Sequence, residues 1–203
     1  MSNFNNRFLK DGVLLNLNLL FCLLMIFVSN DLHAKQAAPK LPYYNWGACL
    51  GEGCWSNAEW HKWRVEQKCN LYANTKQTKI MQKLKVNTYV KALQSVVITR
   101  KFGLVKVLNT HVLNTVISGE DGYQKAKAIL LKKSDIIYEL HFSSEGHYAY
   151  WFNGIIFYEA IPDLPGFKVL SEAETTEMVK VRLSNKVTGW VDRYACNLND
   201  FGG

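Results

Sequence analysis

The sequence predicts an all-β fold built from small, strongly bent barrels, and three observations support this prediction. Residues 178–192 alternate between polar and apolar side chains around a turn, as the two arms of a hairpin do. Asn153-Gly154 separates two apolar runs, and this dipeptide is typical of a tight two-residue hairpin turn. No long amphipathic helical pattern occurs after residue 34. We therefore expect strands throughout the chain beyond that point.

The stretch 178–192 is expected to form the closing hairpin of a barrel. In its first arm, 178–183, every second residue is a branched apolar one that would face the core. Residues 184–186 would form the turn, with Asn185 the natural residue for a positive φ. Gly189 in the second arm predicts a bulge or a close approach of another backbone.

Length, composition and the N-terminal pattern predict an exported globular protein. The chain has 203 residues, which favours one or two domains, and its content of 48% hydrophobic and 20% charged residues excludes a disordered class. Residues 1–34 contain a basic start with Arg7 and Lys10, an apolar run over 13–28 and a polar exit. This pattern predicts a secretory signal peptide that is cleaved after Ala34. An uncleaved membrane anchor is the alternative, although the apolar run is short for a spanning helix of about 20 residues.

The net charge points to anionic surroundings. The chain carries a formal charge of +7, and removal of residues 1–34 leaves this value unchanged because they hold as many basic as acidic side chains. Such a charge favours peripheral contact with anionic surfaces such as cell-wall polymers or lipid head groups. The alternative is that it only keeps a basic secreted protein soluble. Nucleic acid is not expected as a partner of an exported protein.

Four cysteines lie beyond the signal peptide, and an even number in an exported domain favours disulfides over free thiols. The disulfide candidates are Cys49, Cys54, Cys69 and Cys196. Three pairings are possible. We expect a local Cys49–Cys54 bridge and a Cys69–Cys196 bridge that joins the two ends of the fold. Since neither C-x-x-C nor a spaced pair of histidines is present, we expect no metal and no cofactor.

The segment 35–59 is rich in cysteine and aromatic residues after an exposed leader over 35–42. The candidate ligand-binding residues are Tyr43, Tyr44, Trp46, Trp55 and Trp60. One interpretation is an exposed aromatic shelf that stacks on sugar rings or grips a peptide. The other is that these rings cover one end of the barrel.

The remaining chain predicts two consecutive units, 60–118 and 123–203. Strands are expected at 63–65, 71–72, 80–84, 89–93, 96–99 and 104–108, then at 136–140, 146–152 and 155–159. Turns are expected at 85–87, 101–103 and 132–135. The polar residues 109–122 predict an exposed loop between the units, 162–166 a linker, and 172–177 a short helical or acidic turn.

Residues 78–93 and 179–191 resemble the opening half and the closing hairpin of the bacterial SH3-like (SH3b) domain family. In that family a Lys-Lys-Gly turn usually stands where residues 85–87 stand here, and an aromatic residue is commoner at the place of Met178. Residues 132–159 are similar to the middle of such a module. The resemblance implies two SH3-like barrels, or one barrel with a large insertion.

The resemblance also implies binding rather than catalysis, because such modules commonly attach to cell-wall peptides or glycans. No binding residue is carried over, since the family's ligand positions lie in variable loops. We expect a non-enzymatic exported module whose ligand is peptidoglycan or an envelope protein.

Two alternatives stay open, and we assign no catalytic residue. A small secreted hydrolase would need a free thiol such as Cys69 beside a base such as His61, and no local motif supports such a pair. An inhibitor of a hydrolase, rather than a hydrolase itself, belongs to this first alternative. A purely structural protein of envelope assembly would instead bind a protein partner without any glycan.

Overall fold

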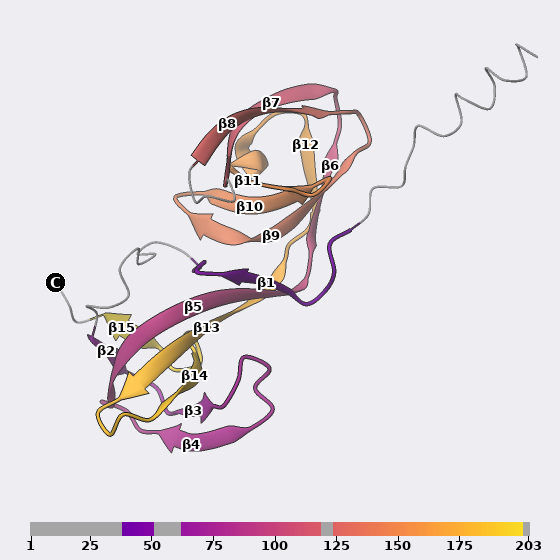
Figure 1. The fold of residues 1–203 in the computed structure, drawn as a ribbon. Coiled ribbons are helices and arrows are strands. Elements are labelled where there is room, and N and C mark those ends of the chain that lie inside the picture. Colours follow the sequence, from indigo (N-terminus) through magenta and orange to yellow (C-terminus); the bar gives the residue numbers. More distant parts are fainter. Residues whose placement is uncertain (1–37, 51–61, 119–123, 201–203) are drawn as a thin grey trace, which may run out of the picture. The chain divides into compact units, whose positions relative to one another are not determined.

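The structure is a computed structural model that describes residues 38–50, 62–118 and 124–200. Strands make up most of these residues, and the only helix among them is the 3₁₀ turn η1 (Ile161–Asp163) (Figure 1). The all-β class predicted from the sequence is therefore confirmed. Several sequence predictions lie outside the described residues: the signal peptide, Cys54, Trp55 and Trp60.

The first sheet combines strands from both ends of the described chain. Its order is β15-β2-β5-β13-β14-β3-β4, with β1 also paired to β5, and the pairs are antiparallel. Its strands are β1 (Tyr43–Trp46), β2 (Lys62–Val65), β3 (Cys69–Tyr72), β4 (Ile80–Leu84), β5 (Tyr89–Lys101), β13 (Glu174–Leu183), β14 (Thr188–Asp192) and β15 (Leu198–Asp200).

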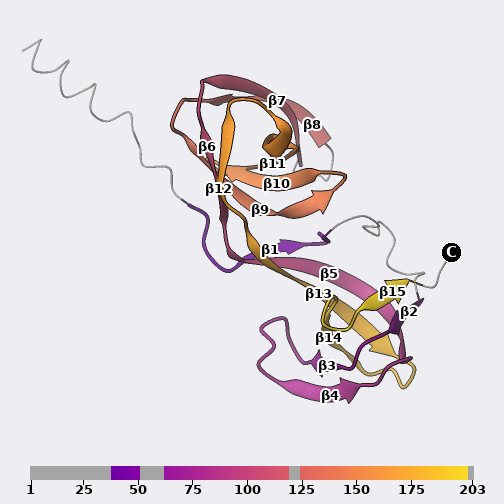
Figure 2. The same cartoon turned by 180° about the vertical axis from the view of Figure 1, so that it is seen from behind.

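The second sheet is formed by one continuous segment that lies between β5 and β13 in the chain (Figure 2). Its order is β12-β6-β9-β10-β11-β7-β8, again antiparallel. Its strands are β6 (Gly103–Val107), β7 (His111–Ser118), β8 (Gln124–Leu131), β9 (Ile136–Ser144), β10 (His147–Phe152), β11 (Ile155–Glu159) and β12 (Phe167–Ser171).

The sheets do not follow the predicted division into units 60–118 and 123–203. Strands β6 and β7 precede the predicted boundary but belong to the second sheet, and β13 to β15 follow it but belong to the first. The cause is the pairing of β5 with β13, which extends from Lys101 opposite Glu174 to Val90 opposite Leu183. In strand order, β6 to β12 are inserted between β5 and β13 of the first sheet.

The turn predicted at residues 101–103 is wrong, because the chain continues from one sheet directly into the next. Strand β5 runs to Lys101, Phe102 is buried, and Gly103 already begins β6. A Cβ atom at Gly103 would lie 2.8 Å from both the Ala173 backbone nitrogen and the Glu139 Cβ atom. A glycine is therefore needed here for close packing between strands.

Two further segments that the sequence predicted to be a loop or a turn contain strands instead. The predicted loop 109–122 contains β7, whose Leu113 side chain is buried and whose Thr115 hydroxyl donates to the Tyr158 carbonyl at 3.1 Å. The predicted helical or acidic turn 172–177 contains the start of β13. In both cases pairing with another strand, β8 for β7 and β5 for β13, turns a polar local sequence into a strand.

The positions of the tight turns are predicted better than the order of the strands. Asn87, Asn153 and Gly154 have φ values of 63°, 48° and 81°, as expected for the turns at these places. In the 184–186 turn, however, the positive φ belongs to Lys186 at 66° rather than to Asn185. The Asn185 Oδ1 atom instead accepts a hydrogen bond from the Val187 N–H at 3.1 Å.

Each sheet has its own core. The first core is formed mainly by aliphatic side chains: Trp63, Val65, Leu71, Leu84, Val90, Ala92, Val179, Val181, Leu183, Val191, Cys196 and Leu198. The second core contains Val105, Val107, Leu113, Ile129, Leu131, Ile137, Tyr150, Phe152, Phe157 and Ile161. We call the face of the first sheet that carries the first core its inner face, and the opposite face its outer face.

Candidate binding face

A bulge between β5 and β13 decides which side chains lie on the outer face of the first sheet. Lys180 lies opposite Gln94, whereas Val181 lies opposite Ala92, so β5 contains one extra residue. Because side chains alternate between the faces of a strand, the bulge leaves Ala92 on the inner face and Gln94 on the outer face. The remaining outer residues follow from the register, since directly opposite residues share a face.

Two rows of side chains cross the outer face. One row runs from Trp46 on β1 through Val96 and Met178 to Asp192 on β14. The other row consists of Gln94, Lys180, Trp190, Tyr72 and Ile80. The rows bring together aromatic residues that are far apart in the sequence.

Four aromatic residues form what we call the aromatic face: Tyr44, Trp46, Tyr72 and Trp190. Trp190 forms a small cluster with Val96, Ile98 and Met178, and Tyr44 and Tyr72 pack against this cluster. The Tyr44 and Trp46 rings are stacked, with centroids 6.2 Å apart and an interplanar angle of 15°. The Trp46 ring meets the Trp190 ring edge-on at 5.8 Å. Trp46 is 54% exposed and Trp190 only 9%, so Trp46 provides the accessible ring of this pair.

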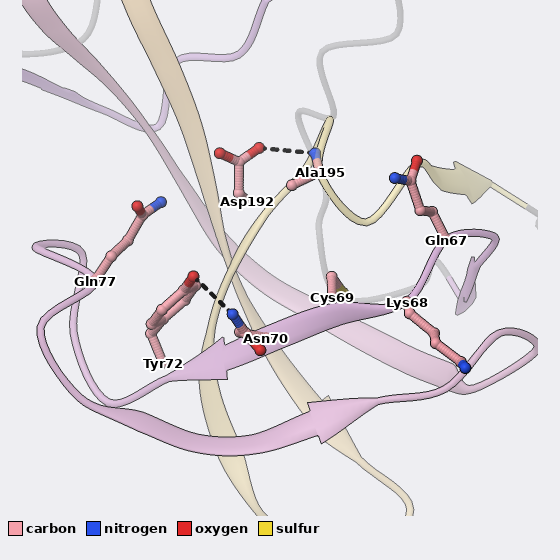
Figure 3. Close-up of a pocket in the computed structure, with 8 residues that line it drawn as sticks. All are labelled: Gln67, Lys68, Cys69, Asn70, Tyr72, Gln77, Asp192 and Ala195. Carbon is pink, nitrogen blue, oxygen red and sulfur yellow. Dashed lines mark hydrogen bonds between the residues drawn. The ribbon is translucent and has the colours of Figure 1, made fainter.

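A polar cleft adjoins the aromatic face at Tyr72 (Figure 3). It has a volume of about 410 Å³ and is lined by Gln67, Lys68, Cys69, Asn70, Tyr72, Gln77, Asp192 and Ala195. Strand β14 pairs with β3 only where Trp190 lies opposite Tyr72. Beyond this pair the two strands separate, and the space between them is the cleft.

A disulfide joins the two sides of the cleft. Cys69 lies on β3, and its sulfur is bonded to that of Cys196 at 2.09 Å, with the Cα atoms 5.0 Å apart. This is the long-range pairing expected from the sequence. Cys49 is also in a disulfide, while its expected partner Cys54 lies outside the described residues.

Hydrogen bonds hold the polar side chains around the cleft (Figure 3). The Asn70 amide donates to the Tyr72 hydroxyl at 3.2 Å. The Asp192 Oδ1 atom accepts bonds from the Tyr194 and Ala195 N–H groups at 3.1 and 3.0 Å. From the loop between β3 and β4, the Gln77 amide reaches the Met178 sulfur at 3.0 Å. The cleft thus offers amide, hydroxyl and carboxylate groups in fixed positions.

A buried charge holds the segment that follows β1. The Glu177 carboxylate is fully buried and accepts a hydrogen bond from the Leu50 N–H at 3.0 Å. The Arg193 guanidinium binds the same carboxylate at 3.1 and 3.2 Å. Burial raises the pKa of Glu177, and the Leu50 N–H and Arg193 oppose this rise. The contact fixes the chain four residues beyond Trp46.

A buried histidine holds β1 itself. The His141 Nε2 atom lies 2.8 Å from the Asn45 amide nitrogen, and Nδ1 lies 2.9 Å from the Phe142 carbonyl oxygen. A neutral imidazole satisfies both bonds, with Nδ1 donating and Nε2 accepting. Burial lowers the pKa of His141. Because Asn45 lies between Tyr44 and Trp46, this contact positions the strand that carries both rings.

The structure separates the aromatic residues that the sequence groups together. Tyr44 and Trp46 lie on the outer face. Because side chains alternate along β1, Tyr43 lies on the opposite side, where it packs with a cluster that includes Phe102. Burial raises the pKa of Tyr43, and the nearby Tyr158 adds to this effect. Tyr43 is therefore not part of the aromatic face.

Sequence reasoning did not find several members of the site: Asn70, Tyr72, Gln77, Trp190 and Asp192. The alternation in 178–192 places Trp190 and Asp192 on the same side of the hairpin as Met178, so the sequence alone could have indicated these two residues. The meeting of Tyr72 with Trp190 depends on the pairing of β3 with β14, which no local pattern indicates.

Within the described residues, no cluster of three or more His, Cys, Asp or Glu side chains is arranged to hold a metal ion. None of the helical turns in that part of the chain is long and apolar enough to cross a membrane. Comparisons with protein-family models, curated protein sequences and solved structures find no match for this chain.

Proposed function

We propose that the protein is an exported, non-enzymatic SH3-like binding module that binds a cell-wall ligand on the outer face of its first sheet. The observation that carries the proposal is the continuity of the aromatic face with the polar cleft through Tyr72. Exposed rings beside fixed polar groups are a common arrangement in ligand sites. The ligand would contact Trp46 and reach into the cleft.

The chemistry of this surface favours a glycan-containing ligand. The flat Trp46 and Tyr44 rings suit the apolar faces of sugar rings, while the amides of Asn70 and Gln77 suit hydroxyl or peptide groups. The cleft volume of about 410 Å³ falls in the range typical of small-ligand pockets, roughly 300–1,000 Å³. A wall fragment that combines sugar and peptide would use both parts.

Export and the SH3-like assignment are supported by separate features. The disulfide between Cys69 and Cys196 favours an oxidising compartment, in agreement with the signal-peptide pattern of residues 1–34. The antiparallel first sheet, with its β13–β14 hairpin, supports a barrel-like unit. The resemblance of residues 78–93 to the opening half of an SH3b domain adds to this support.

The thiol-hydrolase alternative loses one of its proposed nucleophiles. Cys69 is in a disulfide, so it does not supply the thiolate that such an enzyme requires. Its proposed base His61 lies outside the described residues. A role in envelope assembly remains the second candidate, distinguished by a protein partner and no affinity for glycan.

The test is co-sedimentation with insoluble peptidoglycan, using protein purified from cells that express the full chain. We expect the protein to pellet with peptidoglycan and Trp46→Ala to weaken this binding at least tenfold. Leu130→Ala is the matched control, because Leu130 is also 54% exposed but lies on β8 of the second sheet. If the unaltered protein stays in the supernatant, or if the two variants bind equally well, the proposal is wrong.

A further inference from the structure

The outer face carries a row of cations beside the aromatic face. Lys62 on β2 lies directly opposite Lys91 on β5, and Lys91 lies directly opposite Arg182 on β13. Their neighbours Trp63, Val90 and Val181 belong to the first core, so the three cations lie on the outer face. We call Lys62, Lys91 and Arg182 the cation row.

Like charges directly opposite each other on neighbouring strands destabilise a sheet. Elsewhere the protein balances its charges, as in the ion pairs Arg64–Glu66 and Lys101–Glu174, with N–O distances of 2.7 and 2.9 Å. No carboxylate among the described residues forms an ion pair with any member of the cation row. The sequence also has no Asp or Glu between Glu66 and Glu120. The cation row is therefore a patch of positive charge that no ion pair neutralises among the described residues.

The cation row and the aromatic face belong to one continuous surface. Along β13, Arg182 is four residues from Met178, whose row contains Trp46. At about 3.3 Å per residue the two rows are about 13 Å apart. Lys180 lies between them, opposite Trp190, and adds a further positive charge. An extended ligand can thus contact the rings at one end and the cations at the other.

We propose that the outer face binds an acidic glycan, whose sugar rings stack on the aromatic face and whose carboxylates bind the cation row. This inference rests on the proposed function and adds the charge of the ligand to it. A planar carboxylate matches the fork of the Arg182 guanidinium, and Lys91 and Lys62 stand beside it. Gln94 and Thr188, which flank these cations on the same face, suit glycan hydroxyls.

A glycan fits this surface better than the other polyanions. Single-stranded nucleic acid also combines stacking bases with negative charge. However, the disulfide of Cys69 and Cys196 favours an oxidising compartment, where nucleic acid is not the usual partner. An anionic membrane would use the charge of the cation row but would leave the polar cleft unused.

The experiment measures the affinity of the full-length protein for soluble polygalacturonate, an acidic glycan, and for dextran, a neutral one. We expect polygalacturonate to bind at least tenfold more tightly than dextran, with an affinity that falls as salt is added. Arg182→Gln should weaken polygalacturonate binding about tenfold, because a charge-assisted hydrogen bond is lost. Dextran binding should not change.

Lys133→Gln is the matched control. It removes the same single charge from an exposed turn of the second sheet, and Lys133 takes part in no ion pair among the described residues. If it weakens binding as much as Arg182→Gln, the effect is one of net charge and the cation row has no specific role. A melting temperature no lower than that of the wild-type protein shows for each variant that it is folded.

The outcomes separate this inference from the proposed function. If Trp46→Ala weakens peptidoglycan binding but Arg182→Gln leaves polygalacturonate binding unchanged, the proposed function holds and the acidic-glycan inference fails. If oligothymidylate or vesicles of equimolar phosphatidylcholine and phosphatidylglycerol bind as tightly as polygalacturonate, the inference is also overturned. If neither peptidoglycan nor polygalacturonate binds, both proposals fail.

Discussion

The two faces of the first sheet are built from the same strands but differ sharply in chemistry. On the inner face Val65, Leu71 and Val181 are completely buried. On the outer face, neighbouring positions of the same strands hold the partly exposed Tyr72 and Lys180 beside the buried Met178 and Trp190. One side of these strands thus forms the core, and the other side carries the face that we propose for recognition. Substitutions on the two faces should therefore have separable effects.

The disulfide links the two faces of the first sheet. Cys196 is part of the first core and Cys69 packs against it, while Cys69 also lines the outer cleft. Replacing both cysteines by serine removes a bridge between residues 127 positions apart. On the loop-entropy model we expect a loss of about 4–5 kcal/mol in the free energy of unfolding.

Urea denaturation of the oxidised protein and of the double variant measures this loss. Peptidoglycan binding, measured below the unfolding transition, should also weaken because the cleft walls are no longer joined. A double variant that keeps both its stability and its affinity would show that the bridge matters to neither face.

A second substitution compares the faces directly. Leu71→Ala empties a fully buried position of the first core, and we expect a loss of about 3 kcal/mol in stability. Ile80→Ala is its outer-face counterpart on the neighbouring strand, 51% exposed and opposite Tyr72, and should change stability by only about 0.5 kcal/mol. Urea denaturation of both variants tests the difference. Equal losses would contradict the assignment of the faces.

A pH-dependent effect concerns His141, which supports β1 beneath the aromatic face. Because its pKa is lowered in the folded state, the unfolded chain takes up a proton at higher pH than the folded protein. The stability that His141 contributes is therefore fully present above about pH 6.5 and is lost as the pH falls through its folded pKa. His141→Gln should remove this loss.

Melting temperatures of the wild-type protein and of His141→Gln, recorded from about pH 8 to about pH 5, provide the test. The carboxyls of Glu139 and Glu177 have pKa values raised by burial and change stability in the opposite direction, but they do so in both proteins. The difference between the two melting curves should shrink as the pH falls. A constant difference would show that His141 does not titrate in the unfolding reaction.

The smallest expected effect is a gain in stability on the outer face. Arg182→Gln relieves the repulsion between Arg182 and the opposite Lys91, so it should stabilise the sheet by about 0.5 kcal/mol while it weakens acidic-glycan binding. Urea denaturation against Lys133→Gln checks this. A loss of stability would show that the cation row is not under electrostatic strain.

Much of the local structure could be predicted from the sequence, because turns and alternation depend on near neighbours. Asn153-Gly154 forms its hairpin, and Gly189 approaches another strand as expected: a Cβ there would lie 2.7 Å from the Leu71 Cγ atom. The burial of Val179 and Val181 follows the alternation. These features need no knowledge of distant strands.

The site could be predicted only in part, because it depends on long-range pairing. Trp46 and Tyr44 were candidates, but the grouping of Tyr43 with them ignored the alternation of a strand. The order of the sheets was missed because Gly103 has the local signature of a turn and lies instead in a tight strand contact. Trp190 lies opposite Tyr72, and Arg182 lies opposite Lys91, although more than 80 residues of sequence separate each pair.

The most direct test of the separation of faces is to measure binding and stability together on Trp46→Ala. The Trp46 side chain is 54% exposed, so its loss should change the free energy of unfolding by less than about 1 kcal/mol. Affinity for peptidoglycan should nevertheless fall at least tenfold. A variant that binds as well as the wild-type protein, or that loses affinity only in proportion to its folded fraction, would contradict the proposed role of the outer face.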